Sequence, residues 1–262
     1  MSPVRDAARP TEIAPGVYYL QVRRANVYLV QSEASWALID AGWPESAEPI
    51  RRAAESLFGR DARPAAILLT HAHPDHFGSA ADLARSWELP VWVHGDDLPY
   101  LRGGILPDEL LDPIGRVFTG LQRVLPRATV ARMTSSPLKD LAQALSGDVR
   151  EVPGLPDWDY LHTPGHSPGH LVFFRPKDRV LIAGDVVLTA PIMGLLTSLQ
   201  RPARPPWIAS WDWQLAKTAV GTIAGLEPQV LATGHGVPMT GAGVARDLRR
   251  FANHFSPSVA SR

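Results

Sequence analysis

The sequence predicts a layered α/β fold, and three observations support this prediction. Strand-like and helix-like segments alternate along the chain of 262 residues. Both halves of the chain are rich in strand signals and each half also carries helices, which favours packed layers over a parallel Rossmann sheet. Hydrophobic residues make up 45% of the chain, which is enough for a sizeable core at this length.

The first half of the chain begins with strands and then alternates between helices and strands. β-branched, aromatic and aliphatic residues predict strands over residues 16–22, 26–42, 64–71 and 90–95. Helices are expected over residues 44–59 and 78–88. A polar break at residues 31–35 divides the second strand run, and Gly59 lies just past the end of the first helix. The run at residues 64–71 is nearly all apolar, which is typical of a strand buried on both faces.

The pattern changes over residues 99–148, where Leu, Pro and Arg dominate and strand signals vanish. We expect an inserted, mostly helical and irregular segment in this range. It is either a packed surface excursion or a lid over a site, and the sequence leaves both interpretations open.

Strand signals return in the second half. They cover residues 160–165, 170–176, 179–185 and 229–236. Helices are expected over residues 211–225 and 243–255, with Ser210 as the N-cap of the first. A loop rich in Pro and Trp, residues 198–213, precedes that helix.

Composition limits the partners and the chemistry of the chain. Lys+Arg and Asp+Glu both count 26, so net charge gives no reason to expect nucleic acid or an anionic membrane as a partner. No apolar run approaches the roughly 20 residues that span a bilayer, and residues 1–10 lack the apolar core of a secretory signal. A cytoplasmic location is therefore expected. Because there is no cysteine, any metal must be held by His, Asp or Glu.

The segment HAHPDH, residues 71–76, concentrates three histidines and an aspartate in six positions. In an extended chain His71 and His73 point the same way and can face one ion. Pro74 ends the strand, so Asp75 and His76 are displaced onto the following turn and can face a second ion. Two ions roughly 3.5–4 Å apart can clamp a water molecule and a substrate oxygen. Imidazole and carboxylate ligands suit zinc, with iron and manganese as alternatives.

Further histidines and aspartates follow apolar strands. Asp185 ends the strand-like run at residues 179–185, and His235 lies between two glycines that allow close backbone approach. The segment HTPGHSPGH, residues 162–170, joins two strands, and from spacing alone any of its three histidines is a candidate ligand. Loops at one edge of a sheet are where a rigid scaffold places chemistry, so we expect these side chains to meet.

These motifs together resemble the metallo-β-lactamase fold superfamily. The HAHPDH segment is similar to the H-x-H-x-D-H signature of that family, and the likeness continues in order through LIDAG (38–42), HTPGHSPGH (162–170), AGD (183–185) and TGHG (233–236). The resemblance spans roughly residues 15–240. It implies one domain over residues 1–262, built as an αββα four-layer sandwich with the site at one edge of its two sheets and with residues 99–148 as an insertion.

The resemblance also implies a ligand set. His71, His73 and His166 would hold the first metal, Asp75, His76 and His235 the second, and Asp185 would bridge the two. The family pattern gives Asp75 and Asp185 catalytic roles as well, although a metal-bound Asp75 is a poor free base. A hydroxide between the ions would be the nucleophile, since metal binding lowers the pKa of water from 15.7 to near neutrality.

Other polar residues have lesser expected roles. His162 and His170 are expected to support or pack against the ligands rather than bind metal, and Asp40 to orient a ligand or form a turn. His94 is a weak candidate for substrate contact, and His254 is expected at the surface.

Absences narrow the choice within the family. The lack of cysteine excludes the β-lactamase subclasses that use a cysteine ligand. Asp185 argues against the cysteine-free β-lactamase subclass. His73 and the length of the chain argue against the flavin-dependent diiron relatives. A net charge of zero argues against the nucleases. Small-molecule hydrolases of the glyoxalase II-like, lactonase and esterase types remain. The sequence shows no identifiable glutathione-binding residues and no secure match for the site tyrosine of the lactonases. Tyr100 and Tyr160 are the only later tyrosines, and Tyr160 lies near the His-rich loop.

The sequence therefore predicts a binuclear hydrolase, with zinc as the expected metal, in which a metal-bridging hydroxide attacks the acyl carbon of a small-molecule ester, lactone or thioester. A mononuclear iron persulfide dioxygenase, which would leave Asp75, His76 and His235 unused, stays open. A β-lactam hydrolase, a non-enzymatic binding protein and a homo-oligomer stay open too. Residues 99–148 and 198–213 are expected to set substrate choice, with at least one of Trp207, Trp211 and Trp213 lining the pocket.

Overall fold

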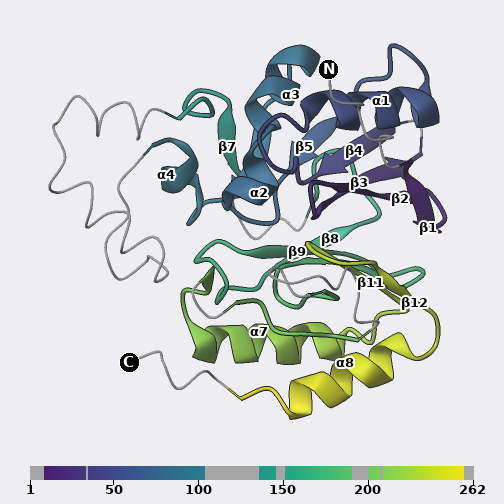
Figure 1. Cartoon of the computed structure of the whole chain (residues 1–262), viewed down its shortest axis with the longest axis vertical. Helices are drawn as coiled ribbons and strands as arrows, with labels where there is room; N and C mark the ends of the chain where they lie inside the picture. The colour runs from purple at the N-terminus through teal and green to yellow at the C-terminus, as the bar shows by residue number, and fades with distance from the viewer. Residues whose placement is uncertain are drawn as a thin grey trace, which may run out of the picture.

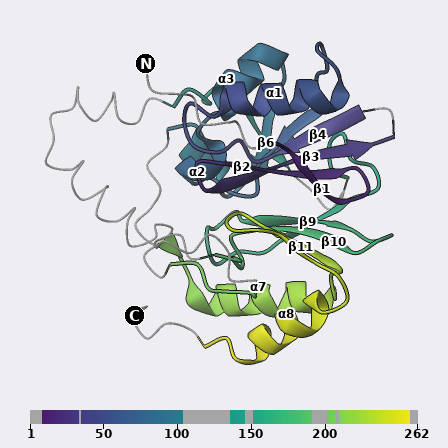
Figure 2. The same ribbon diagram turned by 45° about the vertical axis from the view of Figure 1, so that its right-hand side comes forward.

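The computed structural model describes residues 9–33, 35–103, 136–145, 151–190, 201–206 and 209–256. Two β-sheets face each other in the middle of the molecule, and helices cover the outer face of each sheet (Figure 1). The predicted αββα order of layers is confirmed, and Figure 2 shows the same layers from a second direction. Within the described ranges no helix has the length and apolarity needed to cross a bilayer.

The first sheet has seven strands that lie in the order of the sequence. They are β1 (Thr11–Ala14), β2 (Val17–Val22), β3 (Ala25–Ser32), β4 (Ser35–Ile39), β5 (Ala66–Leu68), β6 (Val91–His94) and β7 (Ala142–Leu145). Strands β1 to β4 pair antiparallel, and β4 to β7 pair parallel. The carboxyl ends of β4, β5 and β6 therefore meet at one edge.

The second sheet has five strands in the order β12-β11-β10-β9-β8. They are β8 (Asp159–His162), β9 (Leu171–Arg175), β10 (Val180–Gly184), β11 (Val230–Thr233) and β12 (Met239–Thr240). Strands β10 and β11 are parallel, so the loops that follow them leave the sheet at the same edge.

Six helices complete the described part of the chain. They are α1 (Ala47–Phe58), α2 (Pro74–Phe77), α3 (Ala80–Trp87), α4 (Leu98–Leu101), α7 (Trp213–Gly225) and α8 (Val244–Asn253). Helices α1 and α3 cover the first sheet, and α7 and α8 cover the second (Figures 1 and 2). The short helices α2 and α4 follow β5 and β6 directly.

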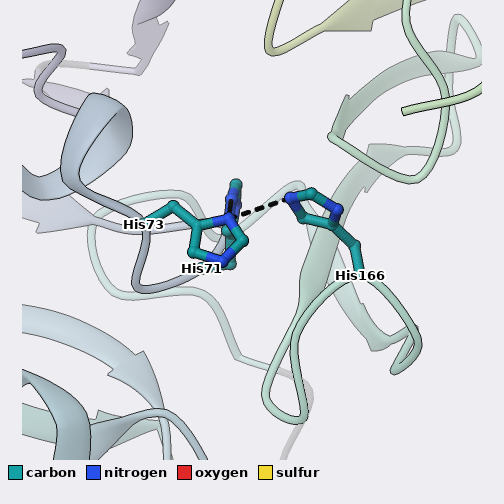
Figure 3. Close-up of side chains that lie close together, drawn as sticks. All are labelled: His71, His73 and His166. Atoms are coloured by element: carbon teal, nitrogen blue, oxygen red, sulfur yellow. Dashed lines mark hydrogen bonds between the residues drawn. The ribbon is translucent and has the colours of Figure 1, made fainter. Parts of the chain in front are cut away.

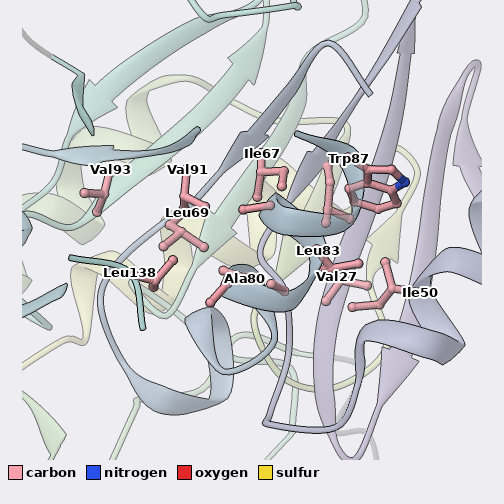
Figure 4. Close-up of a cluster of buried hydrophobic side chains, with 14 of the residues drawn as sticks. Val27, Ile50, Ile67, Leu69, Ala80, Leu83, Trp87, Val91, Val93 and Leu138 are labelled. Carbon is pink, nitrogen blue, oxygen red and sulfur yellow. The ribbon is translucent and has the colours of Figure 1, made fainter. Parts of the chain in front are cut away.

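Alternate residues of the central strands fill two different hydrophobic layers. In β3, Val27 and Leu29 belong to the cluster under α1 and α3 (Figure 4), whereas Tyr28 and Val30 belong to the cluster between the sheets. Successive side chains of a strand point to opposite faces, so a strand between two buried layers is apolar at every position. This explains the nearly all-apolar run around β5. A third cluster lies between the second sheet and helices α7 and α8.

Strand β7 differs from the expectation for residues 99–148, where strand signals were absent. Residues 142–145 pair parallel with β6 and extend the first sheet. The segment AQAL is weak in β propensity, so it forms a strand because it pairs with β6 and not because of its own sequence. Most of the predicted helical insertion, residues 104–135, lies outside the described residues.

The N-cap predicted for the helix after the Trp-rich loop was wrong. Helix α7 begins at Trp213, and the Asp212 carboxylate accepts hydrogen bonds from Gln214 N and Leu215 N at 2.7 and 2.9 Å. Ser210 lies two residues before this cap, and its hydroxyl contacts His166 instead. An aspartate satisfies the free N–H groups of a helix start as well as a serine does.

Candidate metal centre

All seven predicted ligands meet at one edge of the sandwich. His71 and His73 follow β5, and Asp75 and His76 lie in α2. The second sheet contributes the rest from its loops, with His166 before β9, Asp185 directly after β10 and His235 after β11. They form three overlapping groups in which the potential ligand atoms lie within 4.8 Å of one another: His71/His73/His166, His71/His76/Asp185 and Asp75/His76/His235.

The first cluster consists of three imidazoles whose nitrogens converge (Figure 3). The Nε2 of His71 lies 3.0 Å from Nδ1 of His73, which lies 3.0 Å from Nε2 of His166. His71 and His73 come from the first sheet, and His166 reaches them from a loop of the second (Figure 3). Three nitrogens at these separations are the arrangement that a tetrahedral ion needs on one side.

The second cluster combines two imidazoles with a carboxylate. The Oδ2 of Asp75 lies 3.1 Å from Nε2 of His235 and 4.0 Å from Nε2 of His76. Asp185 stands between the two clusters, because its Oδ2 lies 3.6 Å from His166 Nε2 and 3.5 Å from His235 Nε2. Its Oδ1 lies 3.7 Å from His76 Nε2. The Asp185 carboxylate therefore faces both groups of nitrogens.

Buried acceptors hold several rings by the nitrogen that points away from the clusters. Asp40 Oδ2 accepts from His76 Nδ1 at 2.8 Å, and the carbonyl of Arg24 accepts from His235 Nδ1 at 2.8 Å. Thr70 Oγ1 lies 3.0 Å from His71 Nδ1 and donates to Asp40. Such contacts fix the tautomer and leave the other nitrogen free to bind a metal. Asp40 therefore contacts His76 directly and His71 through Thr70, which is the geometry expected of an orienting side chain.

Burial keeps two imidazoles of the first cluster, those of His71 and His166, uncharged. It lowers the pKa of His71 and His166 well below the ordinary histidine value, and the neighbouring imidazoles lower it further. Neutral imidazole is the form that binds metal. These rings are therefore ready to act as ligands at neutral pH.

Charges of both signs gather in the second cluster. Burial opposes ionisation of Asp75 and Asp185, but the imidazoles of His76 and His235 outweigh it, so the pKa of Asp75 falls to about 2 and that of Asp185 falls well below its ordinary value. Burial likewise opposes charge on His235, but the Asp185 and Asp75 carboxylates raise its pKa to about 10. In the metal-free chain this cluster thus attracts positive charge strongly.

Three buried atoms in the cluster have no hydrogen-bond partner among the described residues, namely His76 Nε2, His235 Nε2 and Asp185 Oδ1. Buried polar atoms are almost always paired, so these three atoms indicate a site for a ligand. A Cβ at Gly234 would collide with Asp185 Oδ1 and with the His76 ring, so glycine is what lets this strand end approach. Nitrogen and oxygen donors without sulfur fit zinc, iron or manganese.

The three histidines of residues 162–170 have different roles, and only His166 joins a predicted ligand cluster. His170 is fully buried, and its Nε2 accepts a hydrogen bond from Asp185 N at 3.1 Å while its Nδ1 contacts Thr163 Oγ1 at 3.1 Å. Burial lowers the pKa of His170 to about 3. Its neutral ring therefore supports Asp185, which agrees with the expected supporting role.

His162 instead stacks on His94, with ring centroids 3.9 Å apart and an interplanar angle of 15°. Asp96 lies beside both rings, so the three residues are a separate potential ligand group. Two rings stacked in this way cannot both direct an in-plane lone pair at one ion. His254, at the end of α8, is exposed as predicted.

The tryptophans of the Pro-rich loop differ in their surroundings. Trp213 is buried beneath α7 and stacks on Phe255 with centroids 5.8 Å apart, so it packs in the core. The backbone N of Trp211 donates to the His166 carbonyl at 3.1 Å, which places this residue beside the first cluster. Trp207 lies outside the described residues.

Sequence analysis did not identify Asp97 as part of the site. Its side chain is buried and accepts hydrogen bonds from Ala72, Ser167 and Gly169, in the two loops that carry the first cluster. A signal was available, because Asp97 follows the predicted strand at residues 90–95 in the way that Asp185 follows its own strand.

The sandwich fold and the paired clusters define a class of metal-binding αββα proteins. The family model described as the metallo-beta-lactamase superfamily matches residues 20–235. The chain belongs to this superfamily.

Individual relatives agree with this assignment. The chain is 38% identical over 252 residues to the probable metallo-hydrolase YflN of Bacillus subtilis (strain 168), covering 94% of this chain and 93% of that protein. It is 28% identical over 160 residues to hydroxyacylglutathione hydrolase GloC of Haemophilus influenzae, covering 61% and 65% of the two chains. Among solved structures, TTHA1623 in a di-iron-bound form is similar with a TM-score of 0.56 and 27% identity, over 95% of this chain and 98% of that one.

Proposed function

We propose that this protein is a metal-dependent hydrolase that uses two divalent ions, zinc in the first instance, to cleave an ester, lactone or thioester bond of a small molecule. The observation that carries the proposal is the Asp185 carboxylate, which lies within 3.7 Å of nitrogens from both ligand clusters. The names of YflN, a probable metallo-hydrolase, and of GloC, a hydroxyacylglutathione hydrolase, support the same class of reaction.

The ligand assignment follows from the two clusters. His71, His73 and His166 would hold one ion, Asp75, His76 and His235 the other, and Asp185 would contact both. When bound, such a pair of ions makes water a nucleophile at neutral pH and polarises the substrate carbonyl. The di-iron form of TTHA1623 supports a pair of ions and leaves iron as an alternative to zinc.

The protein's own groups prepare this chemistry. Asp40 Oδ2 contacts His76 Nδ1 and Thr70 Oγ1 contacts His71 Nδ1, so that the Nε2 atom of each ring faces the clusters. The side chain of Asp185 is only 2% exposed, whereas that of Asp75 is 15% exposed. Asp75 is therefore the carboxylate that meets both the cluster and incoming water, and its pKa of about 2 keeps it ionised at neutral pH.

The surroundings of the site favour a substrate with an apolar portion. The large hydrophobic side chains that are exposed in the described part of the chain are Trp43, Tyr100 and Val237. They follow β4, β6 and β11, which are strands whose carboxyl ends lie at the site edge. Trp211, whose backbone N donates to the His166 carbonyl, adds a third aromatic residue near the site. Apolar side chains around a few polar groups are typical of small-molecule sites.

The test is the metal content per chain, measured by plasma mass spectrometry on untagged protein purified without added metal, followed by hydrolysis assays with a lactone, a thioester, an aryl ester and a β-lactam. We expect about two ions per chain and turnover of at least one of the first three substrates. One iron per chain, with oxygen uptake in the presence of a persulfide, would overturn the proposal in favour of a dioxygenase. Turnover of the β-lactam alone would overturn the substrate assignment.

A further inference from the structure

Asp97 is a buried carboxylate outside the predicted ligand set. Only 2% of the residue is exposed. Its Oδ2 accepts hydrogen bonds from Ala72 N at 3.0 Å and from Ser167 Oγ at 2.7 Å, and its Oδ1 accepts from Gly169 N at 2.7 Å. Three donors thus converge on one side chain, which is a costly arrangement to bury unless the contacts are all kept.

The donors belong to the two loops that carry the first cluster. Ala72 lies between His71 and His73, and Ser167 directly follows His166. The first loop leaves the seven-stranded sheet and the second lies between β8 and β9 of the five-stranded sheet. One carboxylate therefore links the backbone at Ala72, 25 residues before it, to Ser167 and Gly169, which lie 70 and 72 residues after it.

The ordinary role of an aspartate at this position is absent. Asp97 precedes helix α4, but its side chain makes no capping hydrogen bond to that helix. It turns inward instead, and a Cβ at Gly169 would lie 2.7 Å from Asp97 N and 2.8 Å from Asp97 Cγ. Glycine at residue 169 is thus what permits the contact. The close approach therefore depends on both residues, Asp97 and Gly169.

The second cluster has different supports. His76 is held by Asp40 and His235 by the carbonyl of Arg24. The side-chain hydrogen bonds of Asp97 all go to the loops of His71, His73 and His166. The support from Asp97 is therefore directed at one cluster, and its loss has unequal consequences for the two.

We propose that Asp97 is a positioning residue that sets the spacing of His71 and His73 against His166 and so fixes the affinity of the first metal site selectively. This inference rests on the proposed function for its ligand assignment. In Asp97→Asn the side chain keeps its size but one oxygen becomes an NH₂ donor, which faces either Gly169 N or the donors at Ala72 and Ser167. Loss of such a supporting contact weakens metal binding by roughly 10–100-fold.

The experiment isolates each site in the full chain. The variant His235→Ala leaves the first cluster intact, and His166→Ala leaves the second. Zinc affinity is measured by competition with a chromogenic chelator, with and without Asp97→Asn in each background. We expect Asp97→Asn to weaken binding roughly 10–100-fold in the His235→Ala background and to change it less than about twofold in the His166→Ala background. Asp96→Asn, at the exposed neighbour, is the matched control and changes neither.

Two results would overturn the inference. One is an unchanged affinity in the His235→Ala background, and the other is an equal loss in both backgrounds, which would mean that Asp97 supports the fold without distinguishing the sites. If Asp97→Asn does not fold, Ser167→Ala removes a single donor and decides the question, with a smaller loss of affinity expected in the His235→Ala background alone. The readout is metal affinity, so failure of every substrate to react would contradict the proposed function and leave this inference standing.

Discussion

Asp40 orients candidate ligands at the scale of single side chains. Its Oδ1 accepts from the backbone N of Thr70 at 2.8 Å, and its Oδ2 accepts from His76 Nδ1 at 2.8 Å and from the Thr70 hydroxyl at 2.9 Å. The same hydroxyl contacts His71 Nδ1, so one carboxylate contacts a ring of the second cluster directly and a ring of the first cluster through Thr70. Its φ of 61° lies in the left-handed region, where Asp and Asn are tolerated best after glycine.

Asp40→Asn therefore tests whether the ionised carboxylate is required. The backbone remains tolerable, but an amide offers one acceptor oxygen where two are used. We expect zinc affinity at the site of His76 to fall roughly 10–100-fold, as for other losses of a group that orients a metal ligand. Chelator competition measures the affinity, and thermal unfolding of the metal-free protein checks the fold. Unchanged affinity in a folded variant contradicts the orienting role.

The sequence identified the ligands that are close together along the chain. It did not identify the supporting residues, whose partners are far away along the chain. His71, His73, Asp75 and His76 fall within six residues, so strand and turn geometry alone predicts two faces. Asp97 and His170 act through contacts to residues 15 to 72 positions away. No periodicity or spacing encodes such contacts, since they depend on how the two sheets pack. For the same reason the choice of His166 among three histidines needed the family resemblance.

At the scale of secondary-structure elements, the ends of β6 and β8 meet through the His94–His162 stack. His94 is partly buried, and its Nδ1 accepts a hydrogen bond from Asp96 N at 3.2 Å. Burial lowers the pKa of His94, the adjacent His162 lowers it further, and Asp96 and Asp97 oppose the shift. The stack thus joins strands from different sheets through a ring that resists protonation.

The sign of these contributions can be checked by NMR titration of the imidazole resonances. We expect the pKa of His94 to lie below 6.5 in the wild type, to rise in His162→Gln and to fall further in Asp96→Asn. Because the unfolded chain binds this proton near pH 6.5 and the folded chain does so only at lower pH, His94 makes the folded state less stable as the pH falls through that window. Shifts of the same sign in both variants would contradict this account.

Helix α7 offers a second test at this scale. Asp212 caps two backbone amides, whereas Ser210, the cap expected from sequence, contacts His166. Asp212→Ala should lower the free energy of unfolding by about 1 kcal/mol, whereas Asp212→Asn, which keeps an oxygen acceptor at the cap, should lower it by less than about 0.5 kcal/mol. Urea denaturation at equal m values measures both. Equal losses in the two variants would contradict a capping role of the Asp212 side-chain oxygen.

The elements themselves were predicted unevenly for physical reasons. Strands buried on both faces, such as β5, can be predicted from apolar composition alone. The edge strands β1 and β12 were missed, because a short strand with one exposed side carries little apolar signal. Strand β7 was missed because pairing with β6, and not its own residues, makes it a strand.

At the scale of the whole molecule, the candidate centre joins the two sheets. The first sheet and its helix α2 supply His71, His73, Asp75 and His76, and the second sheet supplies the remaining ligands, His166, Asp185 and His235. The buried atoms His76 Nε2, His235 Nε2 and Asp185 Oδ1 have no hydrogen-bond partner among the described residues. An ion bound here would hold one half of the molecule against the other, so its removal should lower the global stability of the fold.

Chelation should therefore lower the melting temperature of the folded protein. An ion at a free concentration about 1,000 times its Kd stabilises the native state by about 4.1 kcal/mol, and each kcal/mol moves Tm by about 2–4 °C in a chain of this size. We expect excess chelator to lower Tm by roughly 8–16 °C and added zinc to restore it. In Asp185→Asn, which weakens the contact common to both clusters, the chelator-dependent shift should be much smaller. A wild-type Tm that does not respond to chelator, in protein shown to have lost its metal, would mean that the ions serve chemistry alone and leave the joining of the sheets to the hydrophobic layer between them.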